Sequence, residues 1–462
     1  MHRPLLVLIS AFAFWTLRAG SEEIPAFKLS RQDEDWSIWR GSQPRTHFLD
    51  SIKFVPLNGD ASAWLTLGGE VRERYEYFDN ANWGKGVQDD NGYLLQRFLL
   101  SADAHAGDHF RLFTEFQSGL EDGRNGGPRP TDRDAFDIHQ LFVDARIPVG
   151  GTNTLTIRPG RQELAFGSQR LVSVRDSPNL RRTFDGVRAT LVLEGWQWDA
   201  FATRPVRLKT GVFDDDPDPG TKFWGFYGVT PYSPVPGGRI DVYYLGIDRH
   251  SATYAQGTAP ERRHSVGTRL WGRRSNWDWN HEFVGQFGTF GSHDILAWTA
   301  ASDIGYTFLQ APWSPRTGLK ADVTSGDRNS RDGDLQTFNP LFPRGAYFAE
   351  SGLIGPQNHI DVHPSLELHP VKNLTFNADI DFFWRESVHD GVYNISQTPV
   401  RTGTNGGSRY VGSQATTQIE WRLQRHLTWT INYAHFFAGA FLQENPPGRD
   451  VNYFSSWMSF RF

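Results

Sequence analysis

An arginine-rich run over residues 158–188 carries the clearest chemical signal in the sequence. It holds seven arginines, and its acidic residues are Glu163, Asp176 and Asp185. A guanidinium group stays charged at physiological pH, and its planar fork binds a carboxylate through two hydrogen bonds. The run therefore predicts a site that attracts anions. What such a site does depends on the surface that carries these arginines.

Metal-binding signals are weaker. The segment DRNSRDGD is similar to a calcium loop, but its spacing departs from the EF-hand pattern and no glutamate stands at the twelfth position. His359, His363 and His369 lack a spacing that demands zinc. We expect no cofactor and a solvated loop, with loop calcium as the weaker alternative at Asp327, Asn329, Asp332 and Asp334.

Alternation of apolar and polar residues with a period of two runs from about residue 60 to the end of the chain. In LTFNADIDFFWR (374–385), for example, leucine, phenylalanine and isoleucine alternate with threonine, asparagine and aspartate. Helical spacing explains none of these runs, so they predict β-strands. We expect eighteen strands, at about residues 64–77, 93–105, 110–118, 137–146, 154–163, 185–193, 196–204, 222–230, 240–248, 263–272, 278–289, 295–308, 316–324, 359–368, 374–385, 410–423, 427–437 and 451–462.

The lengths of these segments and of their connections favour a membrane barrel. Most segments are near the ~9–11 residues that a tilted strand needs to cross a bilayer. Very short connections, such as 107–109 and 194–195, contrast with long ones rich in glycine, proline and aspartate, such as 325–358. Because lipid offers no hydrogen-bond partner to an open sheet edge, the sheet must close. We therefore predict an all-β fold, a monomeric transmembrane antiparallel β-barrel of about eighteen strands with short periplasmic turns.

Composition and targeting signals agree with an exported barrel. Aromatic residues make up 14% of the chain although the mean hydropathy is −0.50, as in barrels with an apolar outer face and a polar lumen. The absence of cysteine argues against a small disulfide-stapled secreted fold. We expect a signal peptide at residues 1–21, a loose lead-in at 22–60 and the barrel at 61–462, which ends on Phe462. The expected location is the bacterial outer membrane.

The polar strand faces predict the lining of an aqueous channel, because a barrel of this size is too wide for its own side chains to fill. For any single residue the plainer explanation is an ion pair across neighbouring strands. Residues 164–184 fold either into the pore, as a constriction, or outside it. The predicted pore-lining and substrate-binding residues are Arg72, Arg74, Arg97, Arg111, Arg158, Arg161, Arg170, Arg175, Arg181, Arg182, Asp185 and Arg188.

Several segments resemble the bacterial alginate-export family. They are GRQEL (160–164), FG (166–167), RL (170–171), the SPN and RR pieces of 177–182, FDGVR (184–188), SGD (325–327), TFNPLFP (337–343) and YAHFFAG (433–439). The resemblance covers about residues 62–462 and is most specific over 160–188. It implies an eighteen-stranded outer-membrane barrel with an electropositive, arginine-rich constriction that selects an anionic uronate polymer.

We therefore predict a non-enzymatic channel for the passive, electrostatically selected passage of an anionic polysaccharide or of smaller organic anions. The main alternative is a general or substrate-specific uptake porin with the same barrel. A lipase-type barrel enzyme is a minor alternative, because His435 lies near Ser455 and Ser456 on the neighbouring predicted strand. The expected partners are outer-membrane lipid, the transported anion and periplasmic export proteins, and no nucleic acid.

Overall fold

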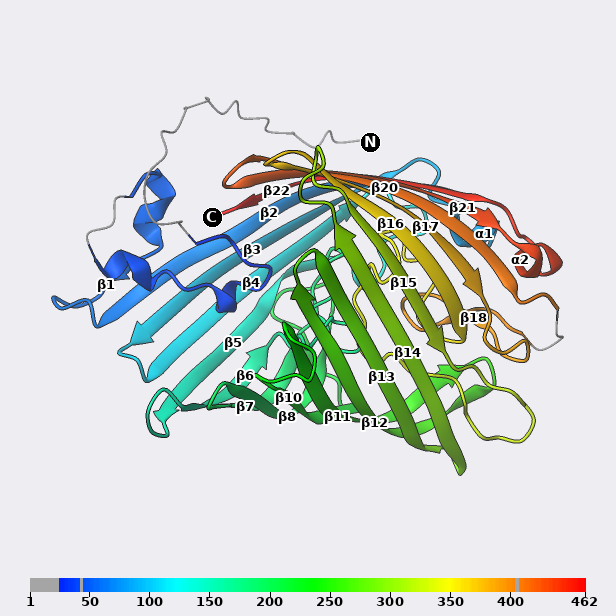
Figure 1. Ribbon diagram of the computed structural model, residues 1–462, viewed down its shortest axis with the longest axis horizontal. Helices are drawn as coiled ribbons and strands as arrows, with labels where there is room; N and C mark the ends of the chain where they lie inside the picture. Colours follow the sequence, from blue (N-terminus) through cyan, green and yellow to red (C-terminus); the bar gives the residue numbers. More distant parts are fainter. Residues whose placement is uncertain (1–24, 42–44, 404–406) are drawn as a thin grey trace.

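The architecture is a closed antiparallel β-barrel of eighteen strands, as predicted (Figure 1). The computed structural model describes residues 25–41, 45–403 and 407–462, so the predicted signal peptide lies outside the described residues. The first half of the barrel contains β2 (Ala63–Asp79), β3 (Tyr93–Ala106), β4 (Phe110–Asp122), β5 (Asp134–Pro148), β6 (Thr154–Gln162), β7 (Phe184–Leu193), β8 (Trp196–Arg207), β10 (Thr221–Val229) and β11 (Gly238–Tyr254).

The second half follows the same up-and-down order and closes onto the first. It contains β12 (Gly257–Arg274), β13 (Trp277–Phe290), β14 (His293–Thr307), β15 (Arg316–Thr324), β16 (His359–Val371), β17 (Leu374–Trp384), β20 (Tyr410–Gln424), β21 (Leu427–Ala438) and β22 (Val451–Arg461). Strand β22 pairs with β2 from Glu70 opposite Arg461 to Asp79 opposite Asn452. This last pairing leaves no open edge among the barrel strands, as a lipid environment requires.

The outer face of the barrel is apolar, and the inner face carries the polar half of each alternating strand. Leu100, Phe287 and Ile380 are among the large apolar side chains exposed on the outside. Arg97, Glu115 and Asp381, which occupy the opposite face of their strands, are fully buried inside. None of the helices in the described part of the chain is long and apolar enough to cross a membrane.

The two ends of the barrel differ in their connections. At one end the strands are joined by short turns, such as 107–109, 275–276 and 372–373, and the C-terminus lies at this end (Figure 1). Most of the long connections lie at the other end, near the short helices α1 (Ala81–Gly84) and α2 (Ala440–Glu444). Short turns are typical of the periplasmic end of such barrels, so we refer to the two ends as inner and outer.

Two of the long outer connections fold back into the lumen and meet there. Loop 163–183 joins β6 to β7, and loop 325–358 joins β15 to β16. Their backbones pair in parallel where Val172 meets Phe342, and Leu171 and Phe338 pack in the same buried apolar cluster. Gly167 adopts a left-handed φ of 57°, and a Cβ there would lie 2.5 Å from the Tyr227 hydroxyl on the wall. Glycine thus allows loop 163–183 to run close against the wall.

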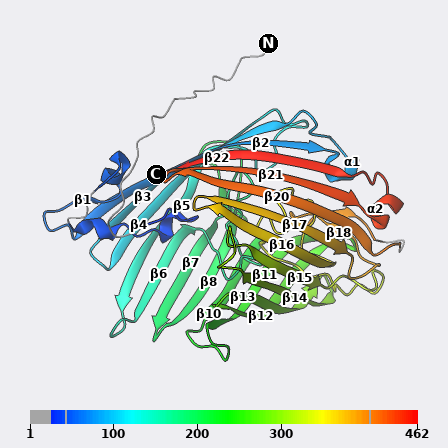
Figure 2. The ribbon, with the colours of Figure 1, turned by 45° about the horizontal axis from the view of Figure 1, so that its top comes forward.

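The described part of the lead-in packs against the inner end of the barrel (Figure 2). It contains three short 3-10 helices, η1 (Arg31–Asp33), η2 (Ser37–Arg40) and η3 (Phe48–Ile52). The remaining short strands are β1 (Val55–Pro56), β9 (Asp216–Pro217), β18 (Val392–Tyr393) and β19 (Pro399–Arg401). Trp36, Trp39 and Phe54 form an aromatic cluster with Trp64 of β2, so the lead-in is held by a small apolar core of its own.

Candidate anion pathway

Two cavities occupy the barrel, one on each side of the loops that fold into it. The outer cavity has a volume of about 710 Å³ and lies among the long loops and the outer half of β2. The inner cavity has a volume of about 640 Å³ and lies between the lead-in and the inner halves of β3 to β7. No residue that the structure describes lines both cavities. An ion that crosses the barrel therefore has to pass the loop network between them.

Arg175 and Arg182 of loop 163–183 line the outer cavity without an acidic partner among the described residues. Arg182 donates a long hydrogen bond, 3.5 Å, to the Pro343 carbonyl, and its guanidinium lies over the ring of Phe342. The Nε of Arg175 is buried and has no hydrogen-bond partner in the described structure. The outer cavity thus presents two uncompensated positive charges.

The surroundings of these two arginines oppose their charge. Burial, and secondarily the charge of Arg129, lowers the pKa of Arg175 to about 10. Burial, and then Arg175 and Arg249, lowers the pKa of Arg182 well below its usual range. A carboxylate beside these groups would reverse both shifts, because an opposite charge favours the ionised form. By contrast, the Glu76, Asp89 and Glu350 carboxylates on the same cavity each contact another arginine.

A network of ion pairs fills the space between the two cavities. Arg97 on β3 lies 2.5 Å from Glu70 and 2.8 Å from Asp176 of loop 163–183. Arg72 on β2 donates to the backbone carbonyls of Asp176 and Pro178. Arg181 contacts Asp176 and, through its Nε at 3.2 Å, Glu163. These predicted pore residues are therefore committed to holding the loop and do not project freely into the channel.

Loop 163–183 is fixed to walls on two sides of the lumen. At one side Asp176 and Ser177 receive bonds from arginines of β2 and β3. At the other, Arg170 lies 3.1 Å from Glu282 on β13. Arg74 also joins this loop to loop 325–358, because it donates to the Ser177 carbonyl and to the Glu350 carboxylate. Loop 163–183 therefore folds into the pore and crosses it, which is the first of the two placements given for residues 164–184.

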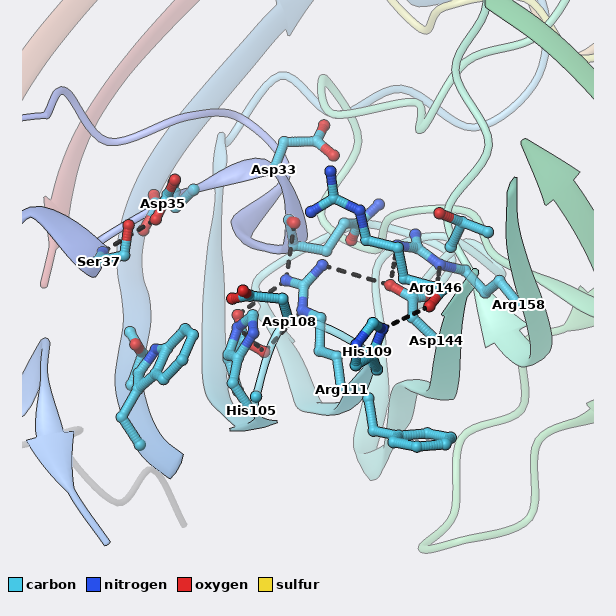
Figure 3. Close-up of a pocket in the computed structure, with 18 of the residues that line it drawn as sticks. Asp33, Asp35, Ser37, His105, Asp108, His109, Arg111, Asp144, Arg146 and Arg158 are labelled. Carbon is cyan, nitrogen blue, oxygen red and sulfur yellow. Dashed lines mark hydrogen bonds and ion pairs between the residues drawn. The ribbon is translucent and has the colours of Figure 1, made fainter. Parts of the chain in front are cut away.

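Paired charges line the inner cavity (Figure 3). Arg111 makes a two-pronged bond to Asp103, at 2.7 and 2.8 Å. Arg158 binds Asp144 in the same way, at 2.6 and 2.7 Å. The predicted residue Arg188 also lines this cavity, and its Nε donates to Asp199 on β8. Each of these arginines is neutralised across neighbouring strands, as the plainer alternative anticipated.

The lead-in reaches from the inner end into the ion-pair network. The Ser30 hydroxyl donates to Glu163 at 2.5 Å, and Arg181 donates to the Leu29 carbonyl. On the inner cavity, Arg111 donates to the Gln32 carbonyl. The sequence predicts a loose lead-in at residues 22–60, and no local pattern in this segment indicates contacts in the lumen. The structure makes it part of the barrier between the two cavities.

Two of the predicted pore residues lie on the face of the barrel wall that points away from the lumen. Arg161 and Asp185 form a two-pronged pair with each other, at 2.8 and 3.0 Å. Arg161 is three residues from Arg158, and Asp185 is three residues from Arg188, so strand alternation puts each on the face opposite a lumenal arginine. Arg161 also contacts the carbonyl of Asp215 in the connection that follows β8. The pore-lining prediction is therefore wrong for this pair, and the odd spacing could have shown it.

Sequence reasoning also missed lumenal residues that belong to distant segments. Arg146, on the inner cavity, was not among the predicted arginines. The sequence indicates 325–358 only as a long connection, whereas its Asn339 bonds Glu261 on β12 inside the barrel. The possible calcium loop uses its carboxylates locally: Asp327 and Asp332 accept backbone N–H groups within the loop, and Asp334 accepts that of Asp294.

Comparison with known proteins agrees with the barrel fold. The family model described as alginate export matches residues 63–455. Among solved structures, Pseudomonas aeruginosa OpdK with vanillate has a TM-score of 0.59 at 11% identity, covering 86% of this chain and 98% of that one. A BenF-like porin from Pseudomonas fluorescens Pf-5 gives 0.59 at 10% identity with the same coverages. At such low identity these likenesses show the fold alone. A search of curated proteins finds no match.

Proposed function

Because the chain belongs to the alginate-export family, we propose that it is a bacterial outer-membrane channel for the passive passage of anions, either a polyuronate-type polysaccharide or smaller organic anions. The observation that carries this proposal is the uncompensated pair Arg175 and Arg182 on the outer cavity. Nearly every other lumenal arginine described above contacts an acid or a backbone carbonyl. A passing carboxylate therefore meets two neighbouring positive charges without an acidic partner at this level of the pore.

The arrangement suits transit better than tight binding. Conduction requires sites that attract an ion but do not hold it too strongly. The two guanidiniums border a cavity of about 710 Å³, where water can solvate an ion that they attract. The paired arginines behind them then supply a polar path without a second strong anion trap. Selection in this scheme is electrostatic.

The size of the cavities favours smaller organic anions in the conformation described. Loop 163–183, loop 325–358 and the lead-in together divide the lumen into spaces of about 710 and 640 Å³, which suit single small molecules. A sugar polymer needs a continuous path, so its passage requires that the lead-in or a loop be displaced. An uptake porin for small carboxylates is therefore the second candidate function.

We also propose that the barrel has no lipase activity. His435 lies on the outer face of β21 and bonds Asn452, whereas Ser455 is fully buried on the opposite face of β22. Ser456 accepts a hydrogen bond from the Trp429 indole. The apolar outer face is a surface for outer-membrane lipid, and the inner end is where periplasmic export partners would dock. We propose no nucleic-acid partner.

Planar-bilayer recordings test the proposal and separate its two forms. We expect a reversal potential that shows anion preference in a KCl gradient. Block of the current by monomeric uronate alone favours the small-anion porin, and block by polyuronate at equal carboxylate concentration favours the polymer channel. A clear cation preference contradicts both forms.

A further inference from the structure

We infer that the lumen wall formed by β15, β16 and β17 binds a divalent transition-metal ion between Asp361, His363 and Asp381. Each of these side chains offers one ligand atom, and the three atoms all lie within 4.8 Å of one another. All three side chains are buried. The site is separate from the arginines on which the proposed anion passage depends.

The strand register brings the three groups together. Asp361 and His363 are two residues apart on β16, so both project into the lumen. Val362 is opposite Phe382 in the β16–β17 pairing, so the next step of this antiparallel ladder sets His363 against Asp381. On the other side of β16, Asp322 of β15 is the direct cross-strand partner of Asp361. Three neighbouring strands thus contribute carboxylates to one point on the wall.

The central carboxylate lacks the hydrogen bonds that a buried charge needs. Asp381 is 0% exposed, and neither of its oxygens has a hydrogen-bond partner of acceptable geometry among the described residues. Its closest recorded contact is Nδ1 of His363, 3.1 Å from its Oδ2. Burying an ionised carboxylate is costly unless it is paired or binds a metal. A cation bound beside Asp381 would compensate this charge.

His363 lies between two carboxylates. While its Nδ1 is beside Asp381, its Nε2 lies 3.0 Å from Asp379. A histidine that binds a metal through one ring nitrogen commonly directs the other N–H to a carboxylate, which fixes the ring and strengthens it as a ligand. In this arrangement Asp379 is the positioning residue. The metal ligands are Asp361, His363 and Asp381.

The negative charge around this point exceeds the nearby positive charge. Asp322 lies beside the site and receives a hydrogen bond from Tyr347 of loop 325–358. Arg170 approaches Asp322 only to 4.0 Å and is mainly engaged with Glu282. His359 bonds both Asp361 and Thr324. Four aspartates therefore share this part of the wall, and a divalent cation would neutralise two of their charges.

A second buried cluster also contains two carboxylates and one histidine, but a cation of the protein already lies beside it. Glu115, His139 and Glu163 also place three ligand atoms within 4.8 Å. There, however, the guanidinium of Arg181 lies 3.2 Å from Glu163, and the Ser30 hydroxyl bonds the same carboxylate. A fixed cation already occupies that position. The cluster around Asp381 has no guanidinium at a comparable distance among the described residues.

The donor set indicates the class of metal. Two carboxylates and one imidazole suit zinc and neighbouring first-row ions better than calcium or magnesium, which prefer oxygen ligands alone. Three protein ligands leave a further position for water or another ligand. We use zinc as the probe.

The test measures zinc binding to the full chain, folded in detergent and stripped with a chelator. Titration calorimetry should show one zinc ion per barrel. Asp381→Asn should weaken binding at least about 100-fold, and Asp379→Asn, which changes the positioning group, about 10- to 100-fold. Asp278→Asn removes an aspartate that pairs with Arg316 at the inner end of β13, and should leave the affinity unchanged.

Heat-modifiable migration on gels confirms that each variant is folded. If Asp381→Asn does not fold, the wild-type chain still decides, because zinc should raise the melting temperature of the stripped barrel. A folded wild-type barrel that binds no zinc overturns the inference. Zinc binding that is the same in wild type, Asp381→Asn and Asp361→Asn also overturns it, because the ion then lies elsewhere.

Discussion

The anion preference of the pore should depend on Arg175 and Arg182, and the double variant Arg175→Gln, Arg182→Gln tests this. Both residues line the outer cavity and lack an acidic partner among the described residues, so glutamine removes charge without leaving an acid unpaired. The variant therefore changes the field in the pore and spares the ion pairs that hold the loop.

The size of the effect follows from Coulomb's law. The interaction energy between one unit charge and a permeant ion about 8 Å away is about 0.5 kcal/mol in a water-like medium. Removing two such charges raises the energy of an anion by about 1 kcal/mol and lowers that of a cation by about as much. The energy difference between anion and cation in the pore should therefore change by about 2 kcal/mol, which corresponds to a fall of about 30-fold in the anion-to-cation permeability ratio.

The assay is the reversal potential in planar bilayers under a KCl gradient. The measurement should be made near 10 mM salt, where the Debye length is about 30 Å, and the effect should shrink toward 1 M salt. Arg262→Gln is the matched control, because Arg262 pairs with Asp248 on the outer face and is 64% exposed. An unchanged permeability ratio in the double variant, or an equal change in the control, refutes the role given to the two loop arginines.

Three further predictions concern the barrier between the cavities. Arg181→Gln leaves the buried Glu163 and the partly buried Asp176 without this cation, so the free energy of unfolding should drop by about 3–5 kcal/mol, as denaturant titration would show; a drop below 1 kcal/mol contradicts the proposed network. Deleting residues 25–54 removes the contacts to Glu163, Arg181 and Arg111, and single-channel conductance should rise; equal conductance would mean that the lead-in does not obstruct the pore. Burial lowers the pKa of His426, in the turn after β20, to about 4, and its ring contacts Phe27 and His47 of the lead-in. Because the unfolded or undocked state binds this proton more readily, docking is fully stable above about pH 6.5 and loses up to about 3 kcal/mol as the pH falls toward 4. Conductance should therefore rise on acidification, and His426→Gln should remove that dependence.

The local periodicity of the chain was enough to place the strands. All eighteen predicted segments correspond to barrel strands. The reason is that each strand alternates apolar and polar residues in its own sequence, which gives the barrel an apolar outside and a polar inside. The resemblance to the alginate-export family, which is most specific over residues 160–188, is also confirmed. The sequence also placed a basic run at 158–188, but it left open whether residues 164–184 fold into the pore.

Only the tertiary structure decided which of those arginines remain free. Arg181 is neutralised by Glu163 and Asp176, whereas Arg175 and Arg182, from the same loop, find no acid in the described structure. That difference depends on how the loop crosses the lumen, which no local pattern encodes.

The lead-in and the Asp381 cluster show the same limit. The lead-in reaches Glu163 across more than a hundred residues of sequence, and the candidate metal ligands come from separate strands. Periodicity assigns a side chain to a face of the wall. Ion pairs and ligand sets form between faces that closure of the barrel and the inward folding of the loops bring together, so they exist only in the folded chain.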